Sequence, residues 1–148
     1  MFGETLMPIT DRKLRVFLSY SSADKPMVRQ LYQRLSAEGF IAPWMDEKKL
    51  LPGEAWRSSI KEAVNSSDVV IICLSNSSVN KEGFVQEEIR YAQQIALEKP
   101  KGTIFLIPLR LENCEVPQGL NDLHWVDYFG GQKKENLVKL LTALRTRL

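Results

Sequence analysis

Two adjacent glutamates, Glu87 and Glu88, lie in the segment Gly83–Ala96, GFVQEEIRYAQQIA, and could supply acid or base chemistry. On an α-helix each residue is rotated by about 100° from the one before, which gathers the apolar side chains of this segment into one stripe. The members of the stripe are Val85, Ile89, Ala92 and Ala96. Glu87 falls about 170° from the centre of the stripe, in solvent, whereas Glu88 falls about 70° away, at the margin between core and water. A carboxylate at such a margin is partly desolvated and can line a cleft. Glu88 is therefore the candidate for chemistry, although a solvated surface glutamate is the commoner outcome.

The composition indicates one soluble globular domain. Of the 148 residues, 44% are hydrophobic and 26% are charged, which suits a single domain with a hydrophobic core. The net charge of +2 is spread along the chain without a basic stripe, so a nucleic-acid partner is not expected. No apolar run reaches the roughly 20 residues of a membrane-spanning helix, and the first residues lack the pattern of a signal peptide. We therefore expect a cytoplasmic protein without membrane contact.

The thiols and the single imidazole form no recognisable reactive set. Cys73 and Cys114 lack CxxC spacing, so neither a disulfide scaffold nor a zinc site is expected. His124, in the segment LHWVDY, is expected to be a half-buried strand residue, because no ligand cluster or nucleophile partner surrounds it in the sequence. No metal centre is expected, and a hydrolase built on a serine and a histidine is poorly supported.

Apolar runs and helical stripes alternate along the chain. The runs expected to form strands are Leu14–Tyr20, Phe40–Met45, Asp68–Ser75, Thr103–Leu111 and Leu123–Tyr128. The first helical stripe follows Asp24, a candidate N-cap, and stops at Gly39. The later stripes contain Trp56, Ile60, Ala63 and Val64, then the segment Gly83–Ala96, and finally Leu137, Leu140, Leu141 and Leu144.

This alternation predicts the α/β class and a flavodoxin-like fold, with a five-stranded parallel sheet covered by helices on both faces. Ligands of such folds bind at the carboxyl ends of the strands, where the strand order reverses. In the first loop at these ends, Ser21 and Ser22 precede a helix N-terminus, where free N–H groups favour an anion such as a phosphate. Plain helix capping is the commoner role for such residues.

The other two loops at the strand ends carry different features. In the second, Met45–Trp56, Leu50 and Leu51 stand among charged residues before a Pro-Gly turn. This loop either folds back on its own sheet or protrudes as a contact surface. The third leads into the helix with Phe84 and Glu88, which are four residues apart and therefore neighbours. A ring beside a carboxylate could hold a flat base next to a sugar.

Two other functions of this fold class are disfavoured. A phosphoacceptor receiver needs acidic residues after the first strand and an aspartate after the third, where this chain has Ser21, Ser22 and Ser75. A dinucleotide-binding enzyme of the Rossmann type needs GxGxxG after a strand, and the chain contains none.

Four stretches, in this order, resemble the Toll/interleukin receptor homology (TIR) domain. VFLSYSSAD is similar to its first box, WMDEKKLLPGEAW to its BB loop, DVVIICLS to its third strand, and GFVQEEIRYA to its helix that runs from an aromatic residue to a glutamate. The resemblance extends from about Lys13 to Leu148, with residues 1–12 as a lead-in, and is strongest to the bacterial branch. It implies a domain joined to a sensor or partner domain in a longer protein, acting as an effector in anti-phage defence or immune signalling.

Many members of that family cleave NAD⁺ between nicotinamide and ribose, so the resemblance implies an NAD⁺ glycohydrolase. Glu88 then takes the catalytic position, and NAD⁺ is the substrate rather than a bound cofactor. The residues expected to contact it are Tyr20, Ser21, Ser22, Asp46, Leu51, Ser75 and Phe84, with Trp44 as a further candidate for the pocket wall. The chain departs from the family in having Phe84 where tryptophan is common, and serines where arginine often follows the first box.

The resemblance also implies self-assembly. Family enzymes often become active when the BB loop of one subunit completes the site of its neighbour, and here that loop contains Leu50, Leu51, Pro52 and Gly53. The expected partners are therefore NAD⁺ and further copies of the domain, in an oligomer or filament. The alternative is a non-enzymatic scaffold that signals through TIR–TIR contacts alone, as animal adaptors of the family do.

Overall fold

The computed structural model describes residues 12–45, 62–79 and 84–148, and for residues 84–88 it describes the backbone only. The strands are β1 (Leu14–Ser19), β2 (Ile41–Met45), β3 (Val69–Leu74), β4 (Leu106–Arg110) and β5 (Val126–Asp127). The helices are α1 (Lys25–Ser36), α3 (Asn76–Val79), α4 (Phe84–Leu97) and α5 (Lys133–Arg145), with 3₁₀ turns η2 (Ser22–Asp24) and η3 (Gly130–Gln132). Residues 62–66 are also helical.

The strands form one five-stranded parallel sheet in the order β2-β1-β3-β4-β5. The register places Val16 beside Val69 and Val70 beside Leu106. After β1 the chain forms β2 on one side and then crosses to form β3 on the other, so the strand order reverses between β1 and β3. The predicted α/β, flavodoxin-like fold is confirmed.

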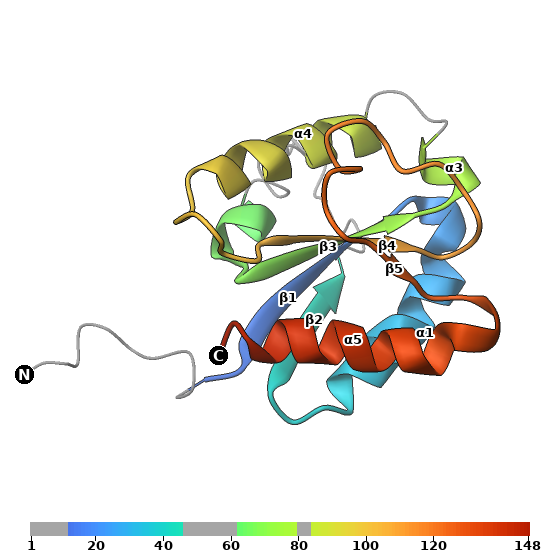
Figure 1. The fold of residues 1–148 in the computed structure, drawn as a ribbon, viewed down its shortest axis with the longest axis horizontal. Helices are drawn as coiled ribbons and strands as arrows, with labels where there is room; N and C mark the ends of the chain where they lie inside the picture. Colours follow the sequence, from blue (N-terminus) through green and yellow to red (C-terminus); the bar gives the residue numbers. More distant parts are fainter. Residues whose placement is uncertain (1–11, 46–61, 80–83) are drawn as a thin grey trace, which may run out of the picture.

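Helices cover both faces of this sheet (Figure 1). Helices α1 and α5 lie on one face, and α4 lies on the other. Alternate residues of β3 divide between the two cores, with Val69, Ile71 and Cys73 on the α1–α5 side and the intervening residues on the α4 side. Every residue of β3 is buried, which explains why its sequence is continuously apolar rather than alternating.

Helix positions largely follow the sequence, but one helix end does not. Helix α1 begins directly after Asp24, as expected, and the four leucines predicted to face the core from α5 are buried. The prediction that Gly39 stops α1 is wrong. The helix ends at Ser36, and the cap residue Ala37 keeps the right-handed helical conformation, with Ala37 N donating to the carbonyl oxygen of Gln33.

The last strand is shorter than expected, and the prediction for His124 is wrong. The backbone N–H of Leu123 donates to the carbonyl oxygen of Leu120 at 3.0 Å, which closes a turn immediately before the strand. This turn keeps the chain away from β4 until Val126, so His124 precedes β5 and is exposed.

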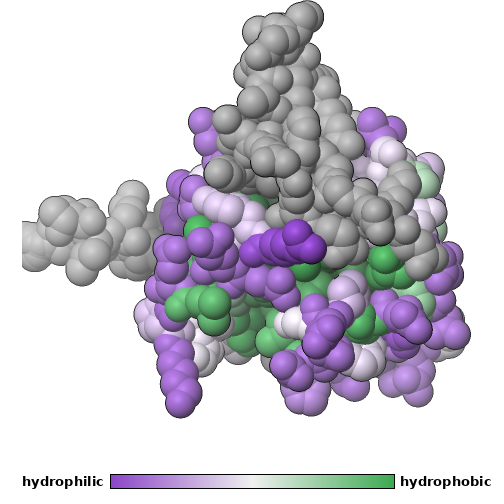
Figure 2. All heavy atoms as spheres, turned by 90° about the horizontal axis from the view of Figure 1, so that it is seen from above, coloured by the Kyte–Doolittle hydropathy of each residue, from purple (hydrophilic) through white to green (hydrophobic). Residues whose placement is uncertain are grey.

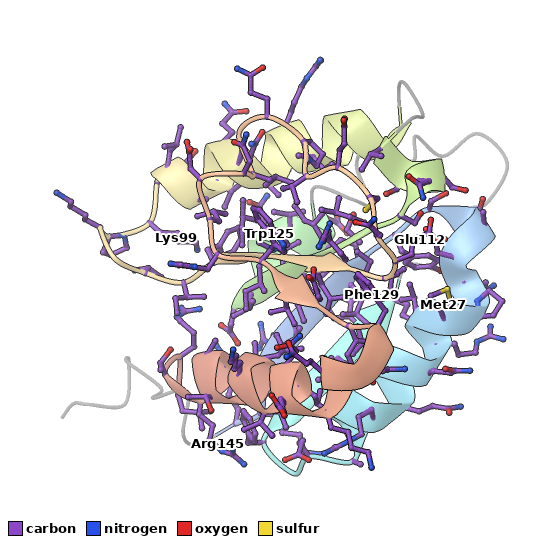
Figure 3. All side chains as sticks on the ribbon, turned by 45° about the vertical axis from the view of Figure 1, so that its right-hand side comes forward. Met27, Lys99, Glu112, Trp125, Phe129 and Arg145 are labelled. Atoms are coloured by element: carbon purple, nitrogen blue, oxygen red, sulfur yellow. The ribbon has the colours of Figure 1, made fainter. Side chains whose placement is uncertain are left out.

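Arg110 compensates for the short pairing of β4 with β5. Its Nε and one terminal nitrogen donate to the two carboxylate oxygens of Asp127 at 2.6 and 2.8 Å, and the other terminal nitrogen donates to the carbonyl oxygen of Cys114 at 2.8 Å. The guanidinium also lies 5.7 and 5.6 Å from the ring centroids of Trp125 and Phe129, both beside β5 (Figure 3). These contacts attach β5 to the sheet through a side chain.

A second arginine–aspartate contact lies at the amino end of the sheet. Arg12 donates to both carboxylate oxygens of Asp68, at 2.7 and 3.0 Å, and the backbone N–H of Arg15 donates to the same carboxylate at 2.8 Å. Arg147 donates to the carbonyl oxygens of Asp68 and Ile104, at 2.5 and 3.1 Å. The first and last parts of the described chain therefore meet beside the start of β3.

We expect acid to destabilise the fold through these two aspartates. Burial alone would raise the pKa of Asp68, but hydrogen bonds from Arg12 and Arg15 hold that pKa below its ordinary value of 3.8, and Arg110 does the same for Asp127. Their stabilisation is present above the ordinary pKa and is lost as the pH falls through the lowered folded-state values. Urea unfolding from about pH 6 to about pH 2.5 should show this loss, and Asp68→Asn or Asp127→Asn should flatten the acid slope.

The exposed Asp122 supplies the matched control, because Asp122→Asn removes a carboxylate without removing either arginine contact. An unchanged acid slope in Asp68→Asn and Asp127→Asn would contradict the assignment.

Candidate functional site

The carboxyl ends of β1, β3 and β4 bring together polar side chains from three loops. Ser21 and Asp24 follow β1, Ser75 and Ser78 follow β3, and Glu112 follows β4. The first four are at least nine-tenths buried, which is unusual for hydroxyl and carboxylate groups. This end of the sheet is where ligands bind in doubly wound folds.

The most direct contact between two of these loops is a hydrogen bond from Ser75 to Asp24. Ser75 Oγ donates to Asp24 Oδ2 at 2.5 Å, and the two side chains are 1% and 7% exposed. Asp24 occupies the N-cap position of α1, but its side chain makes no capping hydrogen bond. The pKa of Cys73, on β3, is raised, first by burial and then by the nearby charge of Asp24.

Further hydrogen bonds organise the turn after β3. Ser78 Oγ accepts the backbone N–H of Ser75 at 2.8 Å and donates to the carbonyl oxygen of Ser75 at 3.1 Å, while Ser75 Oγ accepts the backbone N–H of Ser78 at 3.2 Å. Glu112 accepts the backbone N–H of Asn76 at 2.8 Å and its side-chain amide at 3.0 Å. The turn is therefore fixed to itself and to the end of β4.

Ser21 differs from its neighbours. Its side chain is 2% exposed, and its Oγ has no hydrogen-bond partner in the part of the chain that the structure describes. A buried hydroxyl without a partner costs about 1–3 kcal/mol of desolvation free energy. Ordered water, an ion or a ligand can supply the missing bond of such a group.

Four of the residues predicted to contact the substrate, Tyr20, Ser21, Ser22 and Ser75, lie in the described part of the chain together with their side chains. Tyr20 is buried and packs in the α1–α5 core, and Ser22 is exposed. Ser75 is buried, and its hydroxyl donates a hydrogen bond to Asp24. Ser21, Ser22 and Ser75 do lie at one end of adjacent strands, as expected. Trp44 is half-buried, with its ring centroid 4.7 Å from that of Phe17.

The remaining predicted residues lie outside the described part. The loop residues Asp46, Leu50, Leu51, Pro52 and Gly53 are not described. Phe84 and Glu88 belong to α4 by their backbones, but their side chains are not described. The face of α4 can still be assigned, because Ile89 and Ala92 are buried as predicted and Arg90 is exposed.

Sequence reasoning missed the roles of Asp24, Ser78 and Glu112. Asp24 was interpreted as a helix cap, because position and residue type both fit that role. The sequence feature that could have revealed its role is its position in the loop after a central strand, from which a carboxylate can reach the end of the adjacent strand. Glu112 acts through the backbone N–H of Asn76, 36 residues away, and the sequence alone does not pair segments that are this far apart. Ser78 acts through the backbone of Ser75, three residues before it, where a serine turn was an available local signal.

A separate groove of about 860 Å³ lies at the opposite edge of the sheet, between β5 and α5. Its walls include the first half of β4, the exposed Trp125 and His124, and Asn136 and Lys139 of α5. On the face seen in Figure 2, hydrophobic side chains surface between hydrophilic ones rather than as one continuous apolar area. The groove does not include the strand-end hydroxyls.

The comparisons with known proteins agree with this geometry. The family model described as "TIR domain" matches residues 16–141, so the chain belongs to the TIR domain family. An uncharacterized protein of Sinorhizobium fredii, y4cD, is 32% identical over 128 residues, which is 84% of this chain and 19% of that protein. A second, y4lF, is 27% identical over 103 residues, covering 68% of this chain and 31% of that protein. The chain thus spans less than a third of the length of either relative.

Solved structures show the same fold at low identity. The TIR domain of the Toll-related receptor TRR-2 from Hydra magnipapillata superposes with a TM-score of 0.70 at 21% identity, covering 88% of this chain and 97% of that one. A prokaryotic SEFIR domain gives 0.67 at 14% identity, covering 89% of this chain and 92% of that one. A metazoan TIR-STING receptor from C. gigas gives 0.64 at 23% identity, covering 87% of this chain and 39% of that one. Within the described residues, no helix is long and apolar enough to cross a membrane.

We expect Ser21→Ala to leave the free energy of unfolding unchanged, or to raise it by up to about 1 kcal/mol, because it removes a buried hydroxyl without a partner. Ser75→Ala should instead lower it by about 1.5–3 kcal/mol, because it removes the donor to a buried carboxylate. Urea unfolding of both variants measures the contrast. A loss above about 1 kcal/mol in Ser21→Ala would show that this hydroxyl is already bonded in the free chain.

Proposed function

We propose that this TIR domain is an NAD⁺ glycohydrolase in which Glu88 is the catalytic residue. The observation that carries the proposal is the orientation of α4. The burial of Ile89 and Ala92 fixes which face of the helix packs on the sheet, and a residue one position before Ile89 is rotated by about 100° from it. This supports the predicted place of Glu88 at the margin between core and water.

The strand-end hydroxyls support the same proposal. The ADP part of NAD⁺ carries phosphates and hydroxyls that accept hydrogen bonds, and the buried Ser21 hydroxyl has a proton to donate. Ser22 is exposed at the start of the η2 turn that leads into α1. We propose that this end of the sheet receives the ADP part and that the nicotinamide riboside lies toward Phe84 and Glu88.

The proposed reaction breaks the bond between C1′ of the ribose and the nicotinamide nitrogen. The bonding electron pair leaves with nicotinamide, which becomes neutral, and positive charge develops on the ribose. Water adds to C1′ and releases one proton, giving nicotinamide, ADP-ribose and H⁺; attack by a nucleophile of the substrate itself would give a cyclic product. A carboxylate placed beside the ribose stabilises the developing charge, an effect of about 3–4 kcal/mol for single groups of this kind.

We further propose that activity requires self-assembly through Leu50, Leu51, Pro52 and Gly53. Burial of a leucine side chain against a second copy contributes roughly 1.5–3 kcal/mol. A loop that meets a different surface of its neighbour makes a head-to-tail contact, which can continue into a filament. The proposed setting is the cytoplasm, since both cysteines are free and buried, and the proposed role is defence or immune signalling.

The second candidate function is a non-enzymatic TIR–TIR scaffold. The observation in its favour is the groove beside β5, where Trp125 and Leu123 are 41% and 38% exposed, because exposed aromatic and aliphatic side chains of this kind mark contact surfaces. Release of nicotinamide by the concentrated domain would separate the two candidates, since a scaffold alone leaves NAD⁺ intact.

Glu88→Ala should abolish nicotinamide release by the assembled domain while the chain stays folded. Glu87→Ala is the matched control and should retain most of the activity, because it removes a neighbouring carboxylate on the solvent side of the helix. Release of nicotinamide is followed by chromatography, and folding by circular dichroism. Equal losses in the two variants, or normal turnover in Glu88→Ala, would refute the assignment.

Specific activity should rise steeply with protein concentration, with crowding, or on fusion to an oligomerising partner. Leu51→Asp and Gly53→Asp should abolish assembly and turnover together, because each places a charge in the proposed contact. Sedimentation velocity and the NADase assay on the same dilution series measure both properties. A monomer with constant specific activity across the series would exclude activation by assembly.

A further inference from the structure

We propose that Asp24 is a positioning residue for NAD⁺ cleavage, which holds the loop after β1 against the turn after β3 through its hydrogen bond to Ser75. This inference rests on the proposed function, because it assigns roles within the same site. It gives Ser75 an indirect role in place of the predicted contact with the substrate.

The first argument is the behaviour of Asp24 at the start of α1. An aspartate at an N-cap ordinarily accepts a backbone N–H of the first helical turn. Asp24 makes no such bond and instead accepts the proton of Ser75, which is 51 residues away in the sequence. Its carboxylate is directed toward a different strand end rather than toward its own helix.

The second argument is that the Ser75 hydroxyl is already in use. Its single proton goes to Asp24, its oxygen accepts the backbone N–H of Ser78, and the side chain is 1% exposed. A hydroxyl has only one proton to donate, so Ser75 cannot donate to a substrate while it is bonded to Asp24. Ser21, in contrast, is buried with its proton free of any described partner.

The third argument is where this hydrogen bond lies in the fold. Strands β1 and β3 are adjacent, but the chain leaves them toward opposite faces of the sheet, to α1 after β1 and toward α4 after β3. Figure 1 shows α1 and α3 beginning at the same end of the sheet. The Asp24–Ser75 hydrogen bond connects the loop after β1 to the turn after β3, at the carboxyl ends of the two strands. It therefore holds the loop that carries Ser21 against the turn that contains Ser75 and Ser78, which the chain forms before α4.

Loss of this bond should act mainly on the chemical step. A misplacement of about 1 Å between reacting groups can cost about 100-fold in rate, even when the substituted residue does not touch the substrate. Loosening one loop against another lowers the fraction of bound substrate in the reactive geometry, and this lowers kcat more than it raises KM.

The test compares Ser75→Ala, Ser75→Thr, Asp24→Ala and the double alanine variant in the assembled chain, with kcat and KM for NAD⁺ measured separately. Ser67→Ala is the matched control. Ser67 is also a buried serine, 5% exposed, whose Oγ donates at 2.5 Å to the carbonyl oxygen of Ala63, but it precedes the amino end of β3. Urea unfolding of all variants separates changes in stability from changes in rate.

We expect Ser75→Ala to lower kcat by about 10- to 100-fold with less than about a threefold change in KM. Ser75→Thr, which keeps the hydroxyl, should recover most of this loss, and Ser67→Ala, which also removes a buried hydroxyl, should keep the wild-type kcat. Because Ser75 is proposed to act through its bond to Asp24, removing Ser75 in the Asp24→Ala background should cost no further rate, so the double variant should be no slower than Asp24→Ala.

Several outcomes would overturn the inference. These are a wild-type kcat in Ser75→Ala, an equal loss in Ser67→Ala, or rate losses that multiply in the double variant, as expected if Ser75 touched NAD⁺ directly. A wild-type chain that releases no nicotinamide when assembled would instead refute the proposed function itself. If Asp24→Ala does not fold, the Ser75 variants and the Ser67 control still decide the question.

Discussion

The parallel pairing of β1 with β3 is the constraint on which the rest of this structure depends. Both strands are central, and all of their residues except Arg15 are buried, so their backbones have little freedom to move. The chain leaves them at the same end but toward opposite faces of the sheet, so the loops after β1 and β3 meet only at their carboxyl ends. Polar groups gather there because the backbone of the two departing loops needs hydrogen-bond partners away from water. The same need explains why serines, which can both donate and accept, predominate at this position.

Much of the fold was available from the sequence because its signals are local or periodic. The continuous apolar run of β3 and the leucine stripe of α5 each specify an element and the face that it buries. The short β5 and the exposed His124 were not available, since they depend on a turn and on the contact of Arg110 with Asp127, seventeen positions away. Patterns of hydrophobicity do not encode such contacts between side chains that are distant in sequence.

The candidate site was predictable in outline for the same reason. The topology places Ser21 and Ser75 at one end of the sheet once the strands are recognised, and the helical period assigns the core face of α4. Residue type alone could not distinguish a serine that is free to donate from one whose proton is already engaged, although Ser21 and Ser75 have the same chemistry. That difference comes from Asp24, whose side chain turns away from its own helix and toward Ser75.

The contact of Arg12 and Arg147 around Asp68 has a consequence for how this domain can be handled as a module. Both ends of the described chain are held where the strands of the sheet begin, whereas the polar cluster lies where the strands end. A tether joined to the described chain at Arg12 or at Arg147 would therefore leave from the end of the sheet opposite to the loops that follow the strands. Surface immobilisation, a fluorescent label or a fused carrier at these positions would leave the loop-bearing pole facing outward. Arg12 and Arg147 both contact Asp68, so a carrier joined at either of these residues would present the domain in nearly the same orientation.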